Sequence, residues 1–420
     1  MKTAFFKTGW LQTPEMRRLF EVLGAPAVDV RAVGGAVRNA VMDLPVGEID
    51  IATPDTPDVV AARLGKAGIR AIPTGLDHGT LTALIDGTPF EITSLRRDTA
   101  CDGRHAAVEF TTDWQEDARR RDFTFNAMSM RGDGTLFDYF GGVKDAEDGR
   151  VRFVGDASDR MQEDYLRILR LFRFFAWYGR ASLDAATLEA CRTHAGGLAR
   201  LSVERVQAEL VKTLTAPAPA LVLGLMRDCG VLAAVLPEAH DLLRLAALTR
   251  LESAVAAPTD WRRRLAACVG EGDAESLAQR LKFSTADRVR LVDLTAAEPA
   301  LDAATPRALV RAALYRRGSE VIYDRVLLAW AHARAVASTV DEARWREQLT
   351  HIADWQPQTL PVSGADVIAL GIPQGPRIGE LLSAVETWWM GRDFAASREE
   401  TLTELRRLSL LRTPTPRVSE

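Results

Sequence analysis

The chain has 420 residues, which is too long for one compact core and predicts two to four domains. A hydrophobic content of 47% and a charged content of 26% are typical of a globular protein, and the formal net charge of -4 argues against nucleic-acid binding through overall positive charge. Four scattered cysteines without a CxxC pair argue against a zinc site or a disulfide scaffold, and no run approaches the ~20 apolar residues of a membrane span. The N-terminus lacks the apolar core of a signal peptide, so we expect a cytoplasmic protein with no membrane partner.

Short β-rich runs with helices between them dominate the chain up to residue 155, after a predicted N-terminal leader helix at 1–24. Strands are predicted for 27–34, 48–53, 79–85, 89–95 and 106–112, and a helix for 57–68. This alternation predicts an α+β domain over 25–155, built on a small mixed sheet with helices.

Almost every segment after residue 155 has helical periodicity. Helices are predicted for 157–179, 203–216, 219–237, 239–255, 260–270 and 275–283, with a hinge at 355–364. We therefore expect three all-helical domains, over 156–216, 217–300 and 301–420.

The segment GGAVRN at 34–39 follows the first predicted strand. Gly34 and Gly35 would let the backbone turn tightly and approach a phosphate, and Arg38 would add a guanidinium for its oxygens. Alone, the segment is better interpreted as an ordinary joint between a strand and a helix. The carboxylates that follow it favour a site for phosphate and metal.

Those carboxylates are Glu48 and Asp50 in EIDIAT. Residues two apart in a strand share a face, so both would project the same way. Mg²⁺ prefers oxygen ligands and is held by one or two carboxylates together with substrate phosphates. Glu91 could supply a third carboxylate from a neighbouring strand, or could be a structural strand residue.

Two arginine-rich segments follow. RRRDFTFNAM at 119–128 places three arginines against an apolar run, and Arg121 is the predicted triphosphate contact. In EDYLRILRLFRF at 163–174, helical spacing places Arg167, Arg170 and Arg173 on one stripe, with Asp164 one turn before Arg167. An exposed face with ion pairs would give the same pattern, but the other faces of this helix are apolar, which favours a polar cleft.

The pair formed by Asp164 and Arg167 fits two of the four bases. A carboxylate only accepts hydrogen bonds and a guanidinium only donates them. Cytosine and adenine each offer an amino donor beside a ring-nitrogen acceptor, whereas uracil and guanine offer a carbonyl and an N–H. The pair would therefore select C and A without a template.

Together, GGAVRN, the E-I-D pair, RRDFTFNAM and EDYLRILRLFRF resemble the class II tRNA nucleotidyltransferases, which include CCA-adding enzymes and bacterial poly(A) polymerases. The resemblance covers roughly residues 25–270 and implies a polymerase-β-like nucleotidyltransferase head followed by helical neck, body and tail domains. It also implies template-independent addition of CCA to tRNA 3′ ends from CTP and ATP, with Mg²⁺ as the cofactor.

The resemblance assigns roles to the residues named above. Glu48 and Asp50 take the catalytic and metal positions, and Asp164 and Arg167 take the base-reading positions, with Glu163 orienting the arginine. The remaining nucleotide-binding positions are Gly34, Gly35, Arg38, Arg121, Arg170 and Arg173. The segment 96–106 resembles a flexible loop that helps the site to change from C to A. The family usually has Asp where this chain has Glu48, and often Asp where it has Asn39.

Three alternatives stay open: an A-adding enzyme, a poly(A) polymerase, and a tRNA-binding relative without catalysis. A pI near 6.0 and a short mixed tail favour CCA addition over poly(A) synthesis. His240-Asp241 is interpreted as a helix start rather than part of a phosphohydrolase site. Arginines in 260–264 and 406–412 are candidate tRNA contacts, and the sequence leaves the oligomeric state unknown.

Overall fold

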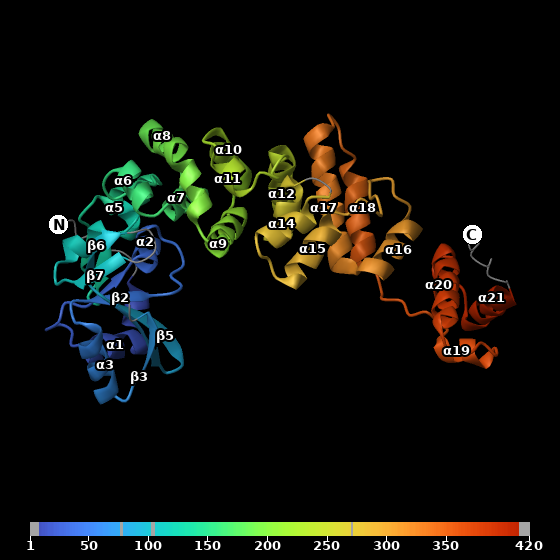
Figure 1. The fold of residues 1–420 in the computed structure, drawn as a ribbon, viewed down its shortest axis with the longest axis horizontal. Helices are drawn as coiled ribbons and strands as arrows, with labels where there is room; N and C mark the ends of the chain where they lie inside the picture. Colours follow the sequence, from blue (N-terminus) through green and yellow to red (C-terminus); the bar gives the residue numbers. More distant parts are fainter. Residues whose placement is uncertain (1–7, 76–78, 102–105, 270–271, 411–420) are drawn as a thin grey trace, which may run out of the picture. The chain divides into compact units, whose positions relative to one another are not determined.

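The computed structural model describes residues 8–75, 79–101, 106–269 and 272–410. The chain falls into two compact units, residues 1–239 with 280–282, and residues 240–279 with 283–420. Each unit is described by itself below, and Figure 1 shows the order of their elements along the chain. No helix among the described residues is long and apolar enough to cross a membrane.

The first unit contains a seven-stranded mixed sheet and a separate two-stranded hairpin. The described strands are β1 (Arg31–Val33), β2 (Asp50–Thr53), β3 (Arg70–Gly75), β4 (Thr80–Ile85), β5 (Thr88–Ser94), β6 (Arg96–Cys101), β7 (Ala106–Phe110), β8 (Ser129–Arg131) and β9 (Leu136–Phe137). The seven-stranded sheet has the order β3-β4-β5-β2-β1-β8-β9, and all its pairs are antiparallel except β2 with β5. The predicted α+β fold is confirmed.

The strand that carries the catalytic candidates is shorter than predicted. It begins at Asp50, which pairs with Val33 at the end of β1, while Glu48 lies on a bend before the strand. Ile51 is completely buried, as alternation along a strand requires, but Ile49 is only half-buried. The prediction that Glu48 belongs to the strand is therefore wrong.

The predicted flexible loop at 96–106 is largely a hairpin. Strand β6 pairs with β7 in antiparallel register from Arg96 opposite Phe110 to Cys101 opposite Ala106. The rest of that predicted loop, 102–105, lies outside the described residues.

Helices of the first unit lie beside the sheet, and the later ones continue away from it (Figure 1). They are η1 (Gly9–Gln12), α1 (Pro14–Val22), α2 (Gly35–Val41), α3 (Pro57–Lys66), α4 (Trp114–Arg119), η3 (Thr124–Asn126), α5 (Gly142–Asp148), α6 (Ala157–Glu163), α7 (Leu166–Tyr178), α8 (Ala185–His194), η4 (Ala195–Arg200), α9 (Val203–Leu214), α10 (Pro219–Asp228) and α11 (Val231–Val235). Phe174 of α7 packs edge-on against Phe123 and Phe125, with ring centroids 5.2 and 5.6 Å apart. These aromatic contacts join α7 to the segment that follows the three arginines.

The predicted helix over 157–179 is interrupted at Asp164. This residue has extended backbone angles, φ -155° and ψ 107°, and it separates α6 from α7. Its carboxylate accepts a hydrogen bond from the Leu166 amide at 3.0 Å. An aspartate that bonds the backbone two residues on offers the chain an alternative to the helix, which explains the break. The prediction that Asp164 and Arg167 share one helical stripe is wrong.

The second unit is helical throughout its described residues. Its helices are α12 (Leu242–Ala254), α13 (Trp261–Cys268), α14 (Ala274–Arg280), α15 (Thr285–Thr295), α16 (Arg307–Arg317), α17 (Ser319–Val336), α18 (Glu342–Ala353), α19 (Gly364–Ala369), α20 (Pro376–Gly391) and α21 (Arg398–Leu410). Asp241 caps α12 by accepting from the Arg244 amide at 2.8 Å, so the predicted helix start at His240-Asp241 is confirmed.

A buried ionic cluster corrects the prediction of tRNA contact for two of the three arginines in 260–264. Arg263 and Arg264 are 2% and 4% exposed. Both donate to the buried carboxylate of Glu252, at 2.6 and 2.8 Å, and Arg263 also donates to Asp324 at 2.6 Å. Buried charges need such partners, so these two arginines hold α12, α13 and α17 together instead of reaching RNA. In the other candidate segment, Arg407 pairs with Glu404 at 2.6 Å, and residues from 411 on lie outside the described part.

Candidate active site

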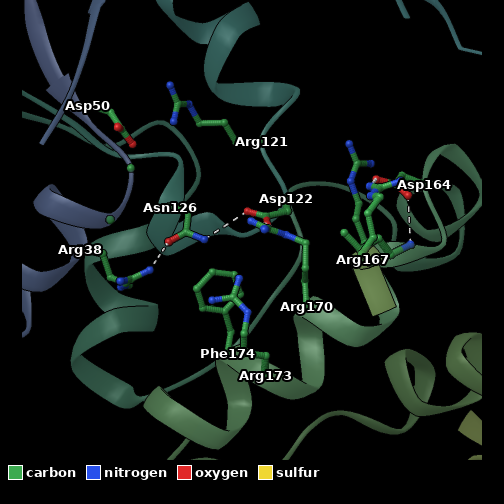
Figure 2. A pocket seen from close by; sticks show the side chains of 14 residues that line it. Arg38, Asp50, Arg121, Asp122, Asn126, Asp164, Arg167, Arg170, Arg173 and Phe174 are labelled. Atoms are coloured by element: carbon green, nitrogen blue, oxygen red, sulfur yellow. Dashed lines mark hydrogen bonds and ion pairs between the residues drawn. The ribbon is translucent and has the colours of Figure 1, made fainter. Parts of the chain in front are cut away.

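A pocket of about 470 Å³ in the first unit collects nearly all the predicted site residues (Figure 2). It is lined by Gly34, Gly35, Arg38, Asp50, Arg121, Asp122, Asn126, Asp164, Leu166, Arg167, Arg170, Arg173, Phe174 and Arg205. Of the ten residues predicted to catalyse or to bind metal or nucleotide, nine line it and Glu48 does not; Glu91 and Glu163, for which supporting roles are predicted, also lie outside its lining. The lining is strongly cationic, with six arginines against three carboxylates, as a site for a polyanionic ligand requires.

One end of the pocket is formed by the turn between β1 and α2. Gly34 has φ 68° and ψ -130°, a backbone conformation that residues other than glycine rarely adopt. A Cβ built there would lie 3.5 Å from Nη1 of Arg121 and 3.7 Å from Oδ2 of Asp50. The absence of a side chain at Gly34 therefore leaves the backbone open between a cation and a carboxylate.

At this end of the pocket, the surroundings of Asp50 disfavour its ionised carboxylate. Desolvation raises the pKa of its carboxyl above the ordinary value, and the charges of Glu91 and Glu48 raise it further, against a lowering by Arg121. Asp50 and Glu91 are register partners on the parallel strands β2 and β5. A bound cation would relieve the repulsion among these carboxylates.

A hydrogen-bonded chain crosses the floor of the pocket (Figure 2). Arg38 donates to Tyr178 Oη and to Asn126 Oδ1, both at 2.8 Å, and Asn126 Nδ2 donates to Asp122 Oδ1 at 3.2 Å. The other oxygen of Asp122 accepts from Nε of Arg170 at 2.7 Å. Burial raises the pKa of Asp122, but the charge and hydrogen bond of Arg170, with the hydrogen bonds from Asn126 and the Phe123 amide, together lower it below its ordinary value. The chain fixes Arg38 and Arg170 in place, and burial lowers the pKa of Arg38.

The predicted arginine stripe is confirmed on α7. Arg167, Arg170 and Arg173 all line the pocket, while the intervening Leu169 and Phe172 are buried. Arg173 is held by Glu209 of α9, which accepts from its Nε at 2.5 Å.

The two predicted base-reading residues have different partners. Arg167 donates to Glu163, the residue expected to orient it, and to the carbonyl oxygen of Arg160 at 3.0 Å. The Asp164 carboxylate instead accepts from Nη2 of Arg205, on α9, at 2.6 Å. Both base-reading candidates therefore reach the pocket, Asp164 from the helix break itself and Arg167 from the first turn of α7.

Arg160 links the two ends of the site without lining the pocket. It is 8% exposed, and its Nη2 donates to the carbonyl oxygens of Arg120 and Arg121 at 2.5 and 2.8 Å. Its Nη1 donates to Glu163 at 2.5 Å. One buried side chain thus connects the backbone that carries Arg121 with the carboxylate that holds Arg167.

The sequence missed several lining residues. Asp122 and Asn126 stand inside the motif RRDFTFNAM, so their neighbours pointed to the site although no role was assigned to them. Phe174 carried a core pattern, which its burial confirms. Arg205 stands in a separate helix, and no local pattern connects it with Asp164.

Two protein-family models match parts of this chain. The family described as "Poly A polymerase head domain" matches residues 30–152, and "Probable RNA and SrmB- binding site of polymerase A" matches residues 182–243. The "CCA tRNA nucleotidyltransferase 1, mitochondrial" of Mus musculus is 35% identical over 94% of this chain and 93% of that protein. The "CCA-adding enzyme" of Limosilactobacillus fermentum is 30% identical over 84% of this chain and 86% of its own length.

Solved structures agree with these relatives. The CCA-adding enzyme of Bacillus stearothermophilus in complex with CTP has a TM-score of 0.75 and 26% identity, covering 94% of this chain and 98% of that one. The Thermotoga maritima CCA-adding enzyme complexed with tRNA has the same fold at 22% identity, with a TM-score of 0.65 and coverage of 96% and 98%. The chain therefore belongs to the tRNA nucleotidyltransferase family of the CCA-adding enzymes.

Proposed function

We propose that this protein adds C, C and A to the 3′ ends of tRNA, using CTP and ATP and releasing pyrophosphate. The observation that carries the proposal is the pocket itself, in which Asp50 and the glycine turn share one cavity with Asp164 and Arg167. A phosphate-binding end and a base-reading end in one cavity fit a single nucleoside triphosphate.

The residues present also fit Mg²⁺. Asp50 supplies a carboxylate with a raised pKa, and Glu91 and Glu48 add negative charge beside it. Among the residues described by the structure, no group of three or more His, Cys, Asp and Glu side chains could hold a metal ion by itself. Mg²⁺ is usually held by one or two carboxylates together with substrate phosphates, so this donor set suits an ion shared with the triphosphate. Asp50 would hold it, with Glu48 and Glu91 beside it.

In the proposed reaction, the oxygen of the tRNA 3′ hydroxyl forms a bond to the α-phosphorus. The bond between that phosphorus and the oxygen bridging to the β-phosphate breaks, and pyrophosphate leaves. Bound Mg²⁺ would lower the pKa of the attacking hydroxyl and neutralise developing charge. The backbone at Gly34 and Gly35 and the guanidinium of Arg121 would orient the triphosphate. Arg38, Arg170 and Arg173 would bind the rest of the nucleotide.

Base choice is proposed for the other end of the pocket. Asp164 would accept a hydrogen bond from the amino group of cytosine or adenine, and Arg167 would donate to the adjacent ring nitrogen. Both residues line the pocket, which supports this assignment. Their different anchors allow each to keep its own position while a base lies between them.

The test is the sequence of the product. The protein would be incubated with Mg²⁺, CTP, ATP and tRNAs that lack CCA, CA or A, and the extended 3′ ends would be sequenced. CCA on all three substrates supports the proposal. Extension of the last substrate alone would identify an A-adding enzyme, long A tracts a poly(A) polymerase, and tRNA binding without extension a non-catalytic relative.

The other expectations stay proposals. The head, neck, body and tail domains would cover 25–155, 156–216, 217–300 and 301–420, with the tail contacting tRNA through phosphates and shape. The cytoplasm is the proposed compartment, supported by the free cysteines Cys191, Cys229 and Cys268. Detecting the protein, made without a fusion tag, in the separate fractions of lysed cells would test this location.

A further inference from the structure

Arg205 forms the one side-chain ion pair that the structure gives to the Asp164 carboxylate among the described residues. Its Nη2 lies 2.6 Å from Oδ2 of Asp164, while the Leu166 amide donates to Oδ1 at 3.0 Å. Arg205 belongs to the first turn of α9 and lines the pocket with Asp164. These two donors hold the carboxylate on both oxygens.

Asp164 depends on these two donors because it lies between two helices and is not part of either. The residue is extended between α6 and α7, and its side chain is 33% exposed. A carboxylate oxygen can accept more than one hydrogen bond, so the two anchors leave lone pairs free for a base.

The arginines of α7 make the anchor necessary. Asp164 is close enough to Arg170 for its charge to raise the pKa of that arginine, and Arg167 lies three residues after Asp164 along the chain, at the start of α7. A carboxylate freed from Arg205 would be drawn toward these guanidinium groups. An ion pair between Asp164 and Arg167 would use up the acceptor and the donor that a base requires.

We propose that Arg205 is a positioning residue for base selection, which keeps the carboxylate of Asp164 apart from Arg167 and turned toward the incoming base. The inference rests on the proposed function and deepens it. It assigns to α9 a part in distinguishing C and A from U and G, although Arg205 need not contact the base.

The test compares Arg205→Ala with the wild type in single-nucleotide incorporation with CTP, ATP, UTP and GTP. Because Arg205 is 45% exposed, its replacement should leave the fold intact, which thermal unfolding checks. We expect the preference for CTP over UTP to fall about fivefold, the effect of an ion pair worth about 1 kcal/mol. The loss should come mainly from a higher KM for CTP and ATP, and Arg205→Lys should restore part of the preference.

Arg192→Ala is the matched control. Arg192 is 47% exposed on α8 and pairs with Glu189 at 2.8 Å, outside the pocket lining. Its replacement should leave the preference unchanged. An equal loss for all four nucleotides in Arg205→Ala would indicate a purely structural role and overturn the inference, as would an unchanged preference.

A double-mutant cycle tests whether Arg205 acts through Asp164. Asp164→Ala and the double variant Asp164→Ala/Arg205→Ala should discriminate equally poorly, measured by equilibrium binding of CTP and UTP. A further loss in the double variant would contradict the inference. If the wild type transfers no nucleotide, the proposed function fails, and the same binding measurement on wild type and Arg205→Ala still decides the role of Arg205.

Discussion

Asp50 and Glu91 lie opposite each other on the parallel strands β2 and β5, and the charge of Glu91 raises the pKa of the Asp50 carboxyl. The pairing places two carboxylates on adjacent strands, and that of Asp50 lies beside the glycine turn. Such an arrangement is unfavourable in the free protein and favourable once a divalent cation is bound.

Replacing Asp50 should lower the transfer rate while slightly raising Tm. Desolvation raises the pKa of Asp50 in the folded state, so its ionisation disfavours folding at neutral pH, and Asp50→Asn should slightly raise Tm without Mg²⁺. The variant should lose transfer by about a thousandfold or more, because the metal loses a ligand. Single-turnover assays and calorimetry measure the two effects.

The exposed Asp58 on α3 provides a control, and Asp58→Asn should keep both activity and Tm. Retained turnover in Asp50→Asn would contradict the metal role. The metal role would also be contradicted if Mg²⁺ raised the Tm of Asp50→Asn by as much as it raises the Tm of the wild type.

Glu91→Gln should shift the pH dependence of the reaction. A raised pKa means that Asp50 becomes protonated, and loses its affinity for metal, at a higher pH than an ordinary carboxyl. Removing the charge of Glu91 lowers that pKa, so the acid limb of kcat/KM for CTP should move to lower pH. A profile measured at a fixed Mg²⁺ concentration below saturation tests this, and an unmoved limb would show that Asp50 does not set it.

Gly34→Ala should weaken the use of both nucleotides. The φ of 68° with ψ -130° costs alanine about 1–3 kcal/mol, and its methyl group would lie 3.5 Å from Nη1 of Arg121. We expect a higher KM for CTP and ATP by similar factors, because the phosphate end does not distinguish bases. Gly47→Ala, which has open space around its Cβ, is the control, and a selective effect on one nucleotide would oppose the assignment.

The ionic cluster of the second unit should govern stability rather than RNA binding. Glu252→Gln leaves Arg263 and Arg264 without their shared buried carboxylate, which should destabilise the unit by about 3–5 kcal/mol. Urea unfolding measures the loss. In the temperature range where the variant is folded, its tRNA affinity and the salt dependence of that affinity should equal those of the wild type, whereas a smaller salt slope would restore these arginines as phosphate contacts.

Local motifs predicted much of the site because its parts are short and contiguous. The glycine turn, Asp50, Arg121 and the stripe from Arg167 to Arg173 each carry a pattern within a few residues. Periodicity could not show the break at Asp164, because the apolar spacing continues across it while one side chain bonds the backbone. It also could not show that Arg205 reaches Asp164, since that contact depends on how α9 packs.

The errors in the second unit have a related cause. Consecutive arginines resemble a solvated basic face unless their partners are known. The partners of Arg263 are Glu252 and Asp324, which come from other helices. Likewise, alternation alone predicts that Glu48 belongs to the strand, although the pairing of β1 with β2 ends at Asp50.

The side chain of Arg160 has a consequence for the size of the substrate. It binds the backbone of Arg120 and Arg121 as well as Glu163, the carboxylate that holds Arg167. The backbone of the proposed triphosphate contact and the carboxylate that holds the proposed base contact are therefore linked through one buried guanidinium. We therefore expect the pocket to favour nucleotides by the distance between base and phosphates as well as by their chemistry.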